Sequence, residues 1–576
     1  MVPAPRRAPA VLSRSRDMAA WRRIWPKSRP AGTAVPSDFR LGRPSATSIA
    51  AAVTPNRQFR VMRATMPDLA WPVARDEPTR ELIRRRVVLS EMLGGPAALP
   101  LAAALLLAAA LIVMLPAEFG VDSWLELTAG RLIWQTGIPH HETLTAMALG
   151  RPWVDQQWLA QLASYAIYRL GGLGLLGVVN VSLLVSGLVL AARTARKQDA
   201  PIVNVLGLLI LCSWLLLPAT EVRTQAYAIP LFAIVVDLLA ADSRAPSRRV
   251  YLTLPILLLW ANLHGTVTLG CALVMLRGTT LAWERRAQLM ASPRAAVGPL
   301  TLLLGAPLTL FATPYGLRML AYYRSTLGSS ALRHTVTEWQ PVTSSPILFV
   351  PVLILIAIMI WAFVRTRAHT WDVIALLVLA AASIAVMRNV PFFALCALAM
   401  LPAAMKHGMN EMSPPIDSLR RRVNVLVVVA AALITATAAI TAIDRRALAF
   451  DGSRSELKML ATVEATMRAN PDLEALADSR FTDLMLWRAP WLAGRLADDV
   501  RYELYTAAEV TRVQNVFTGT GRHWQDGARG FGLVVLDRSA DRQGVALLTR
   551  ERGSRVLYAD RESVVILRSS APATHA

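Results

Sequence analysis

The segment VDSWLELTAGRLIWQTGIPHHETLTAMALGRPWVDQQWL (121–159) comes shortly after an apolar run, 97–115, that is long enough to cross a bilayer. The segment is rich in acidic residues, histidines and tryptophans, which is unusual so close to a membrane span. Ionisable groups at a membrane boundary are costly unless they face water, a partner or a ligand. The segment therefore predicts a polar site at the membrane surface, built directly after the first span.

The composition is typical of a polytopic membrane protein. Of the 576 residues, 54% are hydrophobic and only 17% are charged, and the mean hydropathy is +0.41. The formal net charge of +22 comes from arginines that flank apolar runs or precede them, which fits the orientation rule for membrane proteins and argues against nucleic acid as a partner. All three cysteines lie inside apolar runs, which favours buried thiols over disulfides or a zinc site.

The chain divides into three regions by composition. Residues 1–82, rich in Arg, Pro, Ala and Ser, are expected to form a disordered basic cytoplasmic tail, unless translation starts at one of the later methionines. Residues 83–442 are predicted to be the membrane domain, with a first outer loop at 116–171. Residues 443–576 regain charges and predict a soluble α/β domain. The fold class expected is mainly α, a polytopic membrane helix bundle followed by that domain.

The C-terminal region shows a mixed pattern of strands and helices. Short buried runs predict strands at 532–537, 555–560 and 563–568. Helical patterns cover 454–477 and 502–515. No phosphate-binding loop or nucleophile motif is present in this region of the sequence, so a role in stability or recognition is expected.

About eleven apolar runs predict membrane-spanning helices, and their flanking charges predict an orientation. With the N-terminus inside, the inner loops hold 15 Lys or Arg residues and the longer outer segments hold 8. The positive-inside rule then places the tail in the cytoplasm and residues 443–576 outside a plasma (inner) membrane. The predicted spans are 97–115, 172–192, 201–218, 225–241, 251–263, 265–283, 296–312, 347–365, 371–387, 390–404 and 423–442.

With this orientation, the unusual polar residues all fall on the outer side of the membrane. They form the candidate site, which several loops would build together. The first outer loop contributes Asp122, Glu126, His140, His141, Glu142 and Asp155, and the later outer loops contribute Arg223, Asn262, His264, Tyr315, Glu338, Arg388 and Asn389.

Asp122 and Glu126 are four residues apart, so on a helix they share one face. Two acids this close repel each other at a low-dielectric boundary, and one of them is expected to have a raised pKa, as a general base needs. The alternative is a pair of ordinary solvated or helix-capping carboxylates. The spacing alone does not decide between these two interpretations.

The remaining candidates have both functional and structural interpretations. His140 and His141 follow Pro139 and lack any spaced partner, so a divalent metal stays an open alternative that the spacing does not support. Asn262 and His264 interrupt an apolar run and are expected to line a cavity. Arg388 lies between two apolar runs, where it either holds a phosphate or is an ordinary boundary arginine.

The order of short motifs along the chain resembles a group of bacterial multi-span proteins related to type C glycosyltransferases. No single motif is diagnostic, and the resemblance covers about 97–570. It rests on D-x-W-x-x-x-x-x-G (122–130), G-I-P-x-x-E (137–142), G-x-P-W (150–153), Q-W-L (157–159), Y-x-x-G-G (168–172), N-L-H-G (262–265), P-Y-G (314–316), E-W-Q-P (338–341), R-N-x-P-x-F (388–393), V-R-Y-E-L-Y (500–505) and V-L-Y-A-D (556–560).

This resemblance implies transfer of a sugar from a polyprenyl-phosphate donor to an extracytoplasmic glycan, lipid or protein acceptor, with Asp122 as the catalytic base. Where Glu126, Glu142 and Gln157 stand, the group often has His, Asp and Glu. The change at 157 removes a charge, so a non-catalytic scaffold or lipid-binding protein of envelope biogenesis is kept as the alternative. A transporter would require matching repeats in the two halves, which the sequence does not show.

Overall fold

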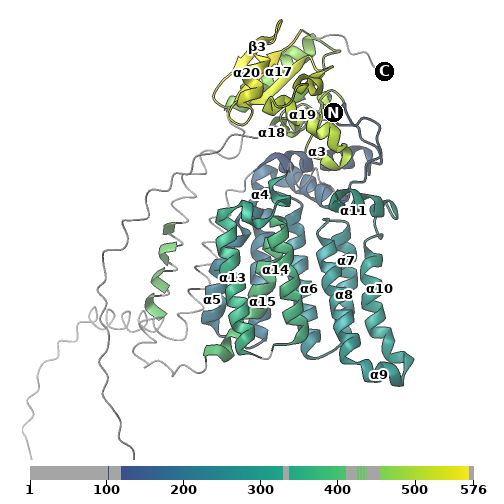
Figure 1. Cartoon of the computed structure of the whole chain (residues 1–576), viewed down its shortest axis with the longest axis vertical. Helices are drawn as coiled ribbons and strands as arrows, with labels where there is room; N and C mark the ends of the chain where they lie inside the picture. Colours follow the sequence, from purple (N-terminus) through teal and green to yellow (C-terminus); the bar gives the residue numbers. More distant parts are fainter. Residues whose placement is uncertain are drawn as a thin grey trace, which may run out of the picture. The chain divides into compact units, whose positions relative to one another are not determined.

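The computed structural model describes residues 119–328, 336–366, 368–409 and 454–569, with short pieces elsewhere. The predicted tail and the first and last predicted spans lie wholly or largely outside these residues. The described chain is mainly helical, with one small sheet near its C-terminal end, as the sequence predicted (Figure 1).

A bundle of apolar helices forms the membrane domain, and its described members lie side by side (Figure 1). Five helical segments in the described part of the chain are long and apolar enough to cross a membrane, so this is a multi-pass membrane protein; the count of eleven stays a prediction. The bundle helices are α4 (Trp158–Lys197), α5 (Ile202–Leu216), α6 (Gln225–Arg244), α7 (Thr253–Ala261), α8 (Val267–Glu284), α10 (Val297–Thr309), α13 (Pro346–Arg365), α14 (Thr370–Ala385) and α15 (Val390–Met409).

Shorter helices connect the bundle helices or lie at their ends. Three are α-helices: α3 (Val121–Thr136), α9 (Arg286–Ala291) and α11 (Arg318–Gly328). The 3₁₀ turns are η1 (Leu217–Thr220), η2 (Arg248–Leu252), η3 (Pro293–Ala296), η4 (Thr337–Trp339), η5 (Val342–Ser344) and η6 (Met387–Asn389). The turns η1, η4, η5 and η6 gather around the candidate site described below.

Helix α4 has a sharp break that separates two different segments. Gly171 and Gly172 leave helical geometry, and Gly172 has a φ of 65°, which glycine adopts without a steric penalty. The first segment of α4, 158–170, therefore ends where the predicted span of 172–192 begins. The break lets the first segment follow a direction different from that of the bundle.

The C-terminal region is a four-stranded sheet with helices around it. The strands β1 (Ala475–Ala477), β2 (Leu533–Asp537), β3 (Arg555–Ala559) and β4 (Ser563–Leu567) have the order β1-β2-β4-β3, with only β1 and β2 parallel. The three predicted strands are confirmed. The surrounding elements are α17 (Arg454–Ala469), α18 (Ser479–Arg488), η7 (Pro490–Leu492), η8 (Tyr502–Leu504), α19 (Ala507–Thr518), η9 (Trp524–Ala528) and α20 (Arg542–Leu548).

The predicted helix over 454–477 is wrong in its second half, where residues 475–477 form β1. The helix ends before Asn470 and Pro471, because proline disfavours helical geometry at the residue before it and cannot donate a backbone hydrogen bond. Helix α19 also begins later than predicted, at Ala507, after the turn η8.

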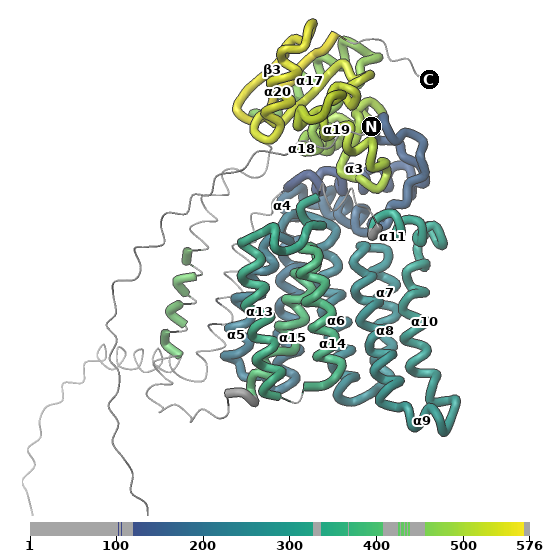
Figure 2. Tube along the Cα trace, in the orientation of Figure 1, coloured from purple at the N-terminus to yellow at the C-terminus, as the bar shows by residue number. Residues whose placement is uncertain are grey.

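The first outer loop is built into this C-terminal region. Backbone hydrogen bonds join Ala146 N to Leu496 O (2.7 Å) and Gly494 N to Leu144 O (2.9 Å), and Leu496 bridges in turn to Ala475 of β1. Leu144 packs in the same apolar core as β1 and α18. In Figure 2 the blue early segment lies beside the yellow-green C-terminal segments. The loop thus extends the sheet beyond β1.

Candidate active site

The acid pair of the first outer loop lies on α3, so its two members have the helical spacing that places them on one face. The carboxylate of Asp122 is 40% exposed, and its Oδ2 lies 3.2 Å from Nε of Arg223. Glu126, one turn later, is buried. Its Oε1 accepts hydrogen bonds from the backbone N of Thr224 (2.7 Å) and from Thr224 Oγ1 (2.9 Å). The two carboxylates therefore share a helix face but have different partners.

Burial changes the chemistry of Glu126. It raises the pKa of this carboxyl to about 8, and the charge of Asp122 adds to the rise, against the lowering effect of the Thr224 hydrogen bonds. Glu126 is therefore mostly protonated at neutral pH and does not compete with Asp122 for Arg223. The expectation that one member of the pair has a raised pKa applies to Glu126.

Arg223 gathers three carboxylates from three separate loops. Besides Asp122, its guanidinium forms ion pairs with Glu221, its neighbour in the chain, and with Glu338 of η4. Burial raises the pKa of Glu221 to about 7. Since these acids engage the guanidinium from several sides, Arg223 organises the acidic part of the site. Its Nε, 3.2 Å from Asp122, has no hydrogen-bond partner among the described residues.

Arg388 has a different environment, in the turn η6. Its Nη2 lies 2.9 Å from Nε2 of His264, and because a guanidinium can only donate, Nε2 must accept. The neutral ring then carries its proton on Nδ1, which lies 2.8 Å from Thr266 Oγ1 and donates to it. The backbone N–H of Thr266, 3.2 Å from the same Nδ1, cannot donate to the protonated nitrogen in this tautomer. Burial lowers the pKa of His264 well below its ordinary value, and the charge of Arg388 adds to this. The Nε of Arg388 is buried without a hydrogen-bond partner among the described residues.

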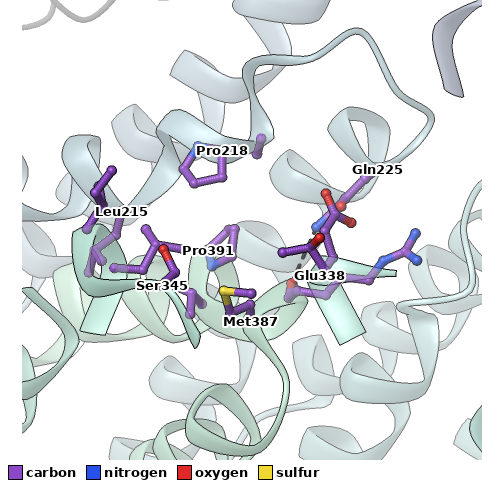
Figure 3. A pocket seen from close by; sticks show the side chains of 13 residues that line it. Leu215, Pro218, Gln225, Glu338, Ser345, Met387 and Pro391 are labelled. Atoms are coloured by element: carbon purple, nitrogen blue, oxygen red, sulfur yellow. Dashed lines mark hydrogen bonds between the residues drawn. The ribbon is translucent and has the colours of Figure 1, made fainter. Parts of the chain in front are cut away.

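A pocket of about 290 Å³ opens beside Arg388 (Figure 3). Its polar end has Gln225, Glu338 and Arg388, and the rest of its wall is mostly apolar. Ile347, on the apolar side, is 69% exposed on the surface of the bundle. The other lining residues are Leu215, Pro218, Ala219, Thr337, Ser345, Leu348, Met387, Val390 and Pro391.

Three of the predicted site residues tie loops together. Asn262 accepts from Trp158 Nε1 (3.0 Å) and donates to the carbonyl of Ala312 (2.9 Å), which links the starts or ends of α4, α7 and α10. Asn389, in the turn η6, donates to the carbonyl of Ala382 in α14 at 3.0 Å. The hydroxyl of Tyr315 donates to the carbonyl of Pro139 at 2.8 Å. Their hydrogen bonds explain these residues without a ligand.

The other candidates of the first outer loop fall into two groups. His140 and His141 are exposed, and the His140 ring contacts Tyr315 edge-on at 5.4 Å. Glu142 is buried, accepts from Thr145 N (2.9 Å) and forms an ion pair with Arg501 of the C-terminal region. In the described part of the chain, no group of three or more His, Cys, Asp and Glu residues is placed to hold a metal ion.

Asp155 precedes α4 and is only 3% exposed. Burial raises the pKa of its carboxyl to about 7, although the charge of Arg501 lowers it. Its Oδ2 has no hydrogen-bond partner among the described residues. Further buried atoms of the same kind lie near the acid pair and the start of α4: Glu126 Oε2, Gln156 Oε1 and Gln161 Oε1. Since most buried polar atoms in native proteins are paired, this region is suited to a polar ligand.

Sequence reasoning missed several residues of this site. Thr224 and Gln225 follow Arg223 in the polar interruption between two apolar runs, so the rule that singled out Arg223 could have found them. Arg501 lies 359 residues after its partner Glu142, and no local pattern links the two. The apolar wall of the pocket has no sequence signal either, because its residues resemble those of every other span.

The comparisons with known proteins concern the fold. No family model matches the chain, and no curated protein matches it significantly. Among solved structures, the apo oligosaccharyltransferase of Archaeoglobus fulgidus is similar, with 11% identity and a TM-score of 0.49 over 76% of this chain and 69% of that chain. The structure of ArnT from Cupriavidus metallidurans bound to undecaprenyl phosphate gives 14% identity and a TM-score of 0.45 over 82% and 98%.

A second structure of the archaeal enzyme, AglB in complex with an inhibitory peptide and a dolichol-phosphate, gives 13% identity and a TM-score of 0.47 over 76% of this chain and 69% of that chain. These neighbours are type C glycosyltransferases, the group that the motifs resemble. At TM-scores below 0.5 they add nothing about donor, acceptor or catalysis, so the chemistry of the site has to follow from its own residues.

Proposed function

We propose that this chain is a membrane glycosyltransferase that moves a sugar from a polyprenyl-phosphate donor to an acceptor hydroxyl on the extracytoplasmic face. The observation that carries the proposal is the apolar pocket that ends at the buried, partly unpaired guanidinium of Arg388. Glu338, at the same end, leads through Arg223 to the carboxylate of Asp122. The pocket wall, Arg388 and Asp122 would thus provide adjacent sites for the hydrocarbon chain of the donor, for its phosphate and for the general base.

The donor lipid fits the two ends of the pocket. Its hydrocarbon chain would lie against the apolar wall and leave past the exposed side chain of Ile347 into the bilayer. Its phosphate would accept hydrogen bonds from the free Nε and a neighbouring nitrogen of Arg388, in the fork geometry that guanidinium offers. The neutral ring of His264 would hold the guanidinium in place from the other side.

The reaction needs one proton acceptor and one site for the leaving phosphate. The acceptor hydroxyl oxygen would attack the anomeric carbon while its proton passes to the carboxylate of Asp122. The bond between the anomeric carbon and the phosphate oxygen breaks, and its electron pair leaves with the polyprenyl phosphate. Arg388 would stabilise the charge that develops on this leaving group. The sugar and the acceptor stay open in this proposal.

The first test is binding of a polyprenyl phosphate to the purified full-length protein. Removing Arg388 from a partly desolvated site is expected to weaken binding by roughly 2–5 kcal/mol, because the phosphate loses its partner. Arg388→Lys should recover only part, since a point charge replaces a fork. Arg318→Ala, which removes an exposed arginine of α11, is the matched control and should leave binding unchanged. Unchanged binding by Arg388→Ala would retire the phosphate site.

A non-catalytic lipid-binding scaffold is the second candidate. The contact between Asp122 and Arg223 favours it, because this ion pair engages the carboxylate that a base must keep available. The two functions differ in one measurement. A scaffold would bind polyprenyl phosphate in an Arg388-dependent way, yet the wild-type protein would transfer no sugar from any of a panel of polyprenyl-phosphate donors.

A further inference from the structure

The connection between α8 and α10, residues 283–297, lies at the end of the bundle opposite the candidate site. Helix α8 begins three residues after His264 and is 18 residues long, or about 27 Å at the usual rise of an α-helix. Helix α10 then returns toward the loop that holds Tyr315. The distance is close to the thickness of the hydrocarbon core of a bilayer. The connection is therefore expected at the surface of the other leaflet.

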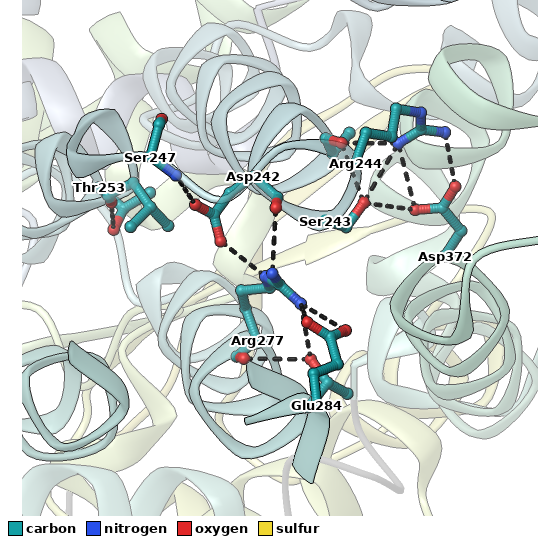
Figure 4. Close-up of polar contacts among 11 residues, drawn as sticks. Asp242, Ser243, Arg244, Ser247, Thr253, Arg277, Glu284 and Asp372 are labelled. Atoms are coloured by element: carbon teal, nitrogen blue, oxygen red, sulfur yellow. Dashed lines mark hydrogen bonds and ion pairs between the residues drawn. The ribbon is translucent and has the colours of Figure 1, made fainter. Parts of the chain in front are cut away.

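A buried arginine, Arg277, forms ion pairs at the α8 end of this connection (Figure 4). Arg277 is wholly buried, and its Nε lies 2.8 Å from Asp242 Oδ2 while its Nη2 donates to the carbonyl of Asp242 at 3.0 Å. Its Nη1 forms an ion pair with Glu284 at 2.9 Å. Glu284 is the one acidic residue within 283–297. Arg277 therefore balances the negative charge of the connection.

Three further arginines of the connection, Arg285, Arg286 and Arg294, form no ion pair with any residue that the structure describes. The guanidinium of Arg286 lies 4.9 Å from the centre of the Trp283 ring. The surface of the connection thus carries a net positive charge that no neighbouring acid of the described chain neutralises.

Large apolar side chains are exposed beside these arginines. Trp283 is 69% exposed and Met290 is 91% exposed. Val297 begins an exposed apolar stripe that continues along the surface of α10 through Leu300, Leu304 and Leu308. This stripe is the lipid-facing side of a bundle helix. The apolar face of the connection is therefore continuous with a surface that hydrocarbon covers.

We infer that residues 283–297 are an anchoring surface for anionic phospholipid head groups of the leaflet opposite the candidate site. Trp283 and Met290 enter the boundary between head groups and acyl chains, where tryptophan is enriched in membrane proteins. The three arginines pair with lipid phosphates, and each contributes about fivefold in affinity for an anionic surface. The continuity with the α10 stripe favours lipid over a soluble protein as the occupant.

The apolar part of the inference is tested with a fluorophore. The three native cysteines are buried, so Met290→Cys can be labelled selectively with an environment-sensitive dye in the full-length protein. In lipid nanodiscs its emission is expected to shift to the blue, as in an apolar medium. A dye at Gln525→Cys, on the exposed surface of the C-terminal region, is the matched control and should report water. Water-like emission at position 290 would overturn the inference.

The charged part is tested by titrating phosphatidylglycerol into phosphatidylcholine nanodiscs of the same protein and measuring the retained anionic lipid by native mass spectrometry. The triple variant R285Q/R286Q/R294Q should lose about 100-fold in preference for phosphatidylglycerol. The control variant R522Q/R550Q/R552Q removes the same charge from exposed positions of the C-terminal region and should lose little. Equal retention by both variants, or an equal loss of both lipids, would overturn head-group recognition.

Discussion

Asp122 and Glu126 lie one turn apart on α3, and burial gives them different chemistry. The spacing of the sequence could place both on one helix face. It could not show which one is buried, because Thr224, the partner that faces Glu126, lies 98 residues further along the chain. The site therefore combines a neutral buried acid with a half-exposed carboxylate that faces Arg223. This division makes Asp122 the better candidate for a base at neutral pH.

Replacing Asp122 by Asn should separate binding from catalysis. If Asp122 is the base, turnover falls by about 10²–10⁴-fold while binding of the polyprenyl-phosphate donor stays nearly unchanged. The measurement is sugar transfer normalised to folded protein in the membrane. Full activity of Asp122→Asn would remove its catalytic role. A small loss of stability without loss of turnover would instead make Asp122 an acid of the first turn that stabilises the N-terminus of α3.

Glu126→Gln is the matched variant on the same helix face. Because the pKa of Glu126 is raised to about 8, this side chain is mostly neutral at pH 6–7, and glutamine should preserve turnover there. Above pH 8 the wild-type carboxyl ionises beside Asp122, so a step in the pH profile of the wild type is expected near that value. The step should be absent from Glu126→Gln. A step of the same size in both proteins would assign it to another group.

Asp483 of α18 should make the free energy of unfolding depend on pH. It is wholly buried, neither carboxylate oxygen has a hydrogen-bond partner among the described residues, and burial raises its pKa well above the ordinary value. The unfolded chain releases this proton near pH 4, about the value of a free Asp. The folded chain keeps it, so stability falls as the pH rises from about 4 toward the folded pKa.

Asp483→Asn removes this penalty. The variant should therefore gain thermal stability over the wild type, and the gain should be larger at pH 8 than at pH 5. Asp526→Asn, a partly exposed acid paired with Arg529, is the control and should show no such trend. A variant that is no more stable than the wild type at pH 8 would show that Asp483 has an ionic partner at neutral pH.

Between elements, the decisive junction joins the first outer loop to the C-terminal sheet. Backbone hydrogen bonds pair 144–147 with 494–497, and Glu142 reaches Arg501, which also binds Asp499. The ring of Trp153 lies 4.3 Å from the Arg501 guanidinium. The predicted division into an outer loop and a separate soluble domain could not include this junction, because local periodicity carries no information on pairing across some 350 residues.

Breaking this ion pair should destabilise both parts of the junction. Arg501→Gln leaves Glu142 and Asp499 buried without their cation, which is expected to cost about 3–5 kcal/mol of stability. The double variant E142Q/R501Q should lose less stability than the sum of the losses of the two single variants, since it no longer leaves the Glu142 carboxylate buried without a partner. Resistance of the full-length protein to proteolysis and heat measures the effect.

Arg529→Gln is the control for this double-mutant cycle of E142Q and R501Q. Arg529 is 80% exposed and pairs with Asp526 on the surface, so its loss should cost under about 1 kcal/mol. Losses for E142Q and R501Q that simply add in the double variant would mean that the two side chains contribute independently.

At the scale of the whole molecule, the sequence predicted the helices of the bundle better than the roles of its polar residues. The break of 251–283 into α7 and α8 falls where the polar residues Asn262 and His264 interrupt the apolar run. The roles of Asn262 and Tyr315 could not be predicted, because a polar residue at a loop looks the same whether it binds a ligand or a carbonyl. The pocket could not be predicted either, because apolar lining residues such as Leu215 and Pro391 do not differ from the residues of any other membrane span.

The orientation of the chain decides whether the site can use an extracytoplasmic acceptor. The excess of Lys and Arg in the predicted inner loops predicts that Ser247 lies in the cytoplasm and the C-terminal region outside. Because all three native cysteines are buried, single cysteines at exposed positions can report this directly. A membrane-impermeant thiol reagent should label Gln525→Cys in intact cells and Ser247→Cys only after the membrane is opened. The reverse pattern would put Asp122 and Arg388 on the cytoplasmic side and exclude the proposed reaction there.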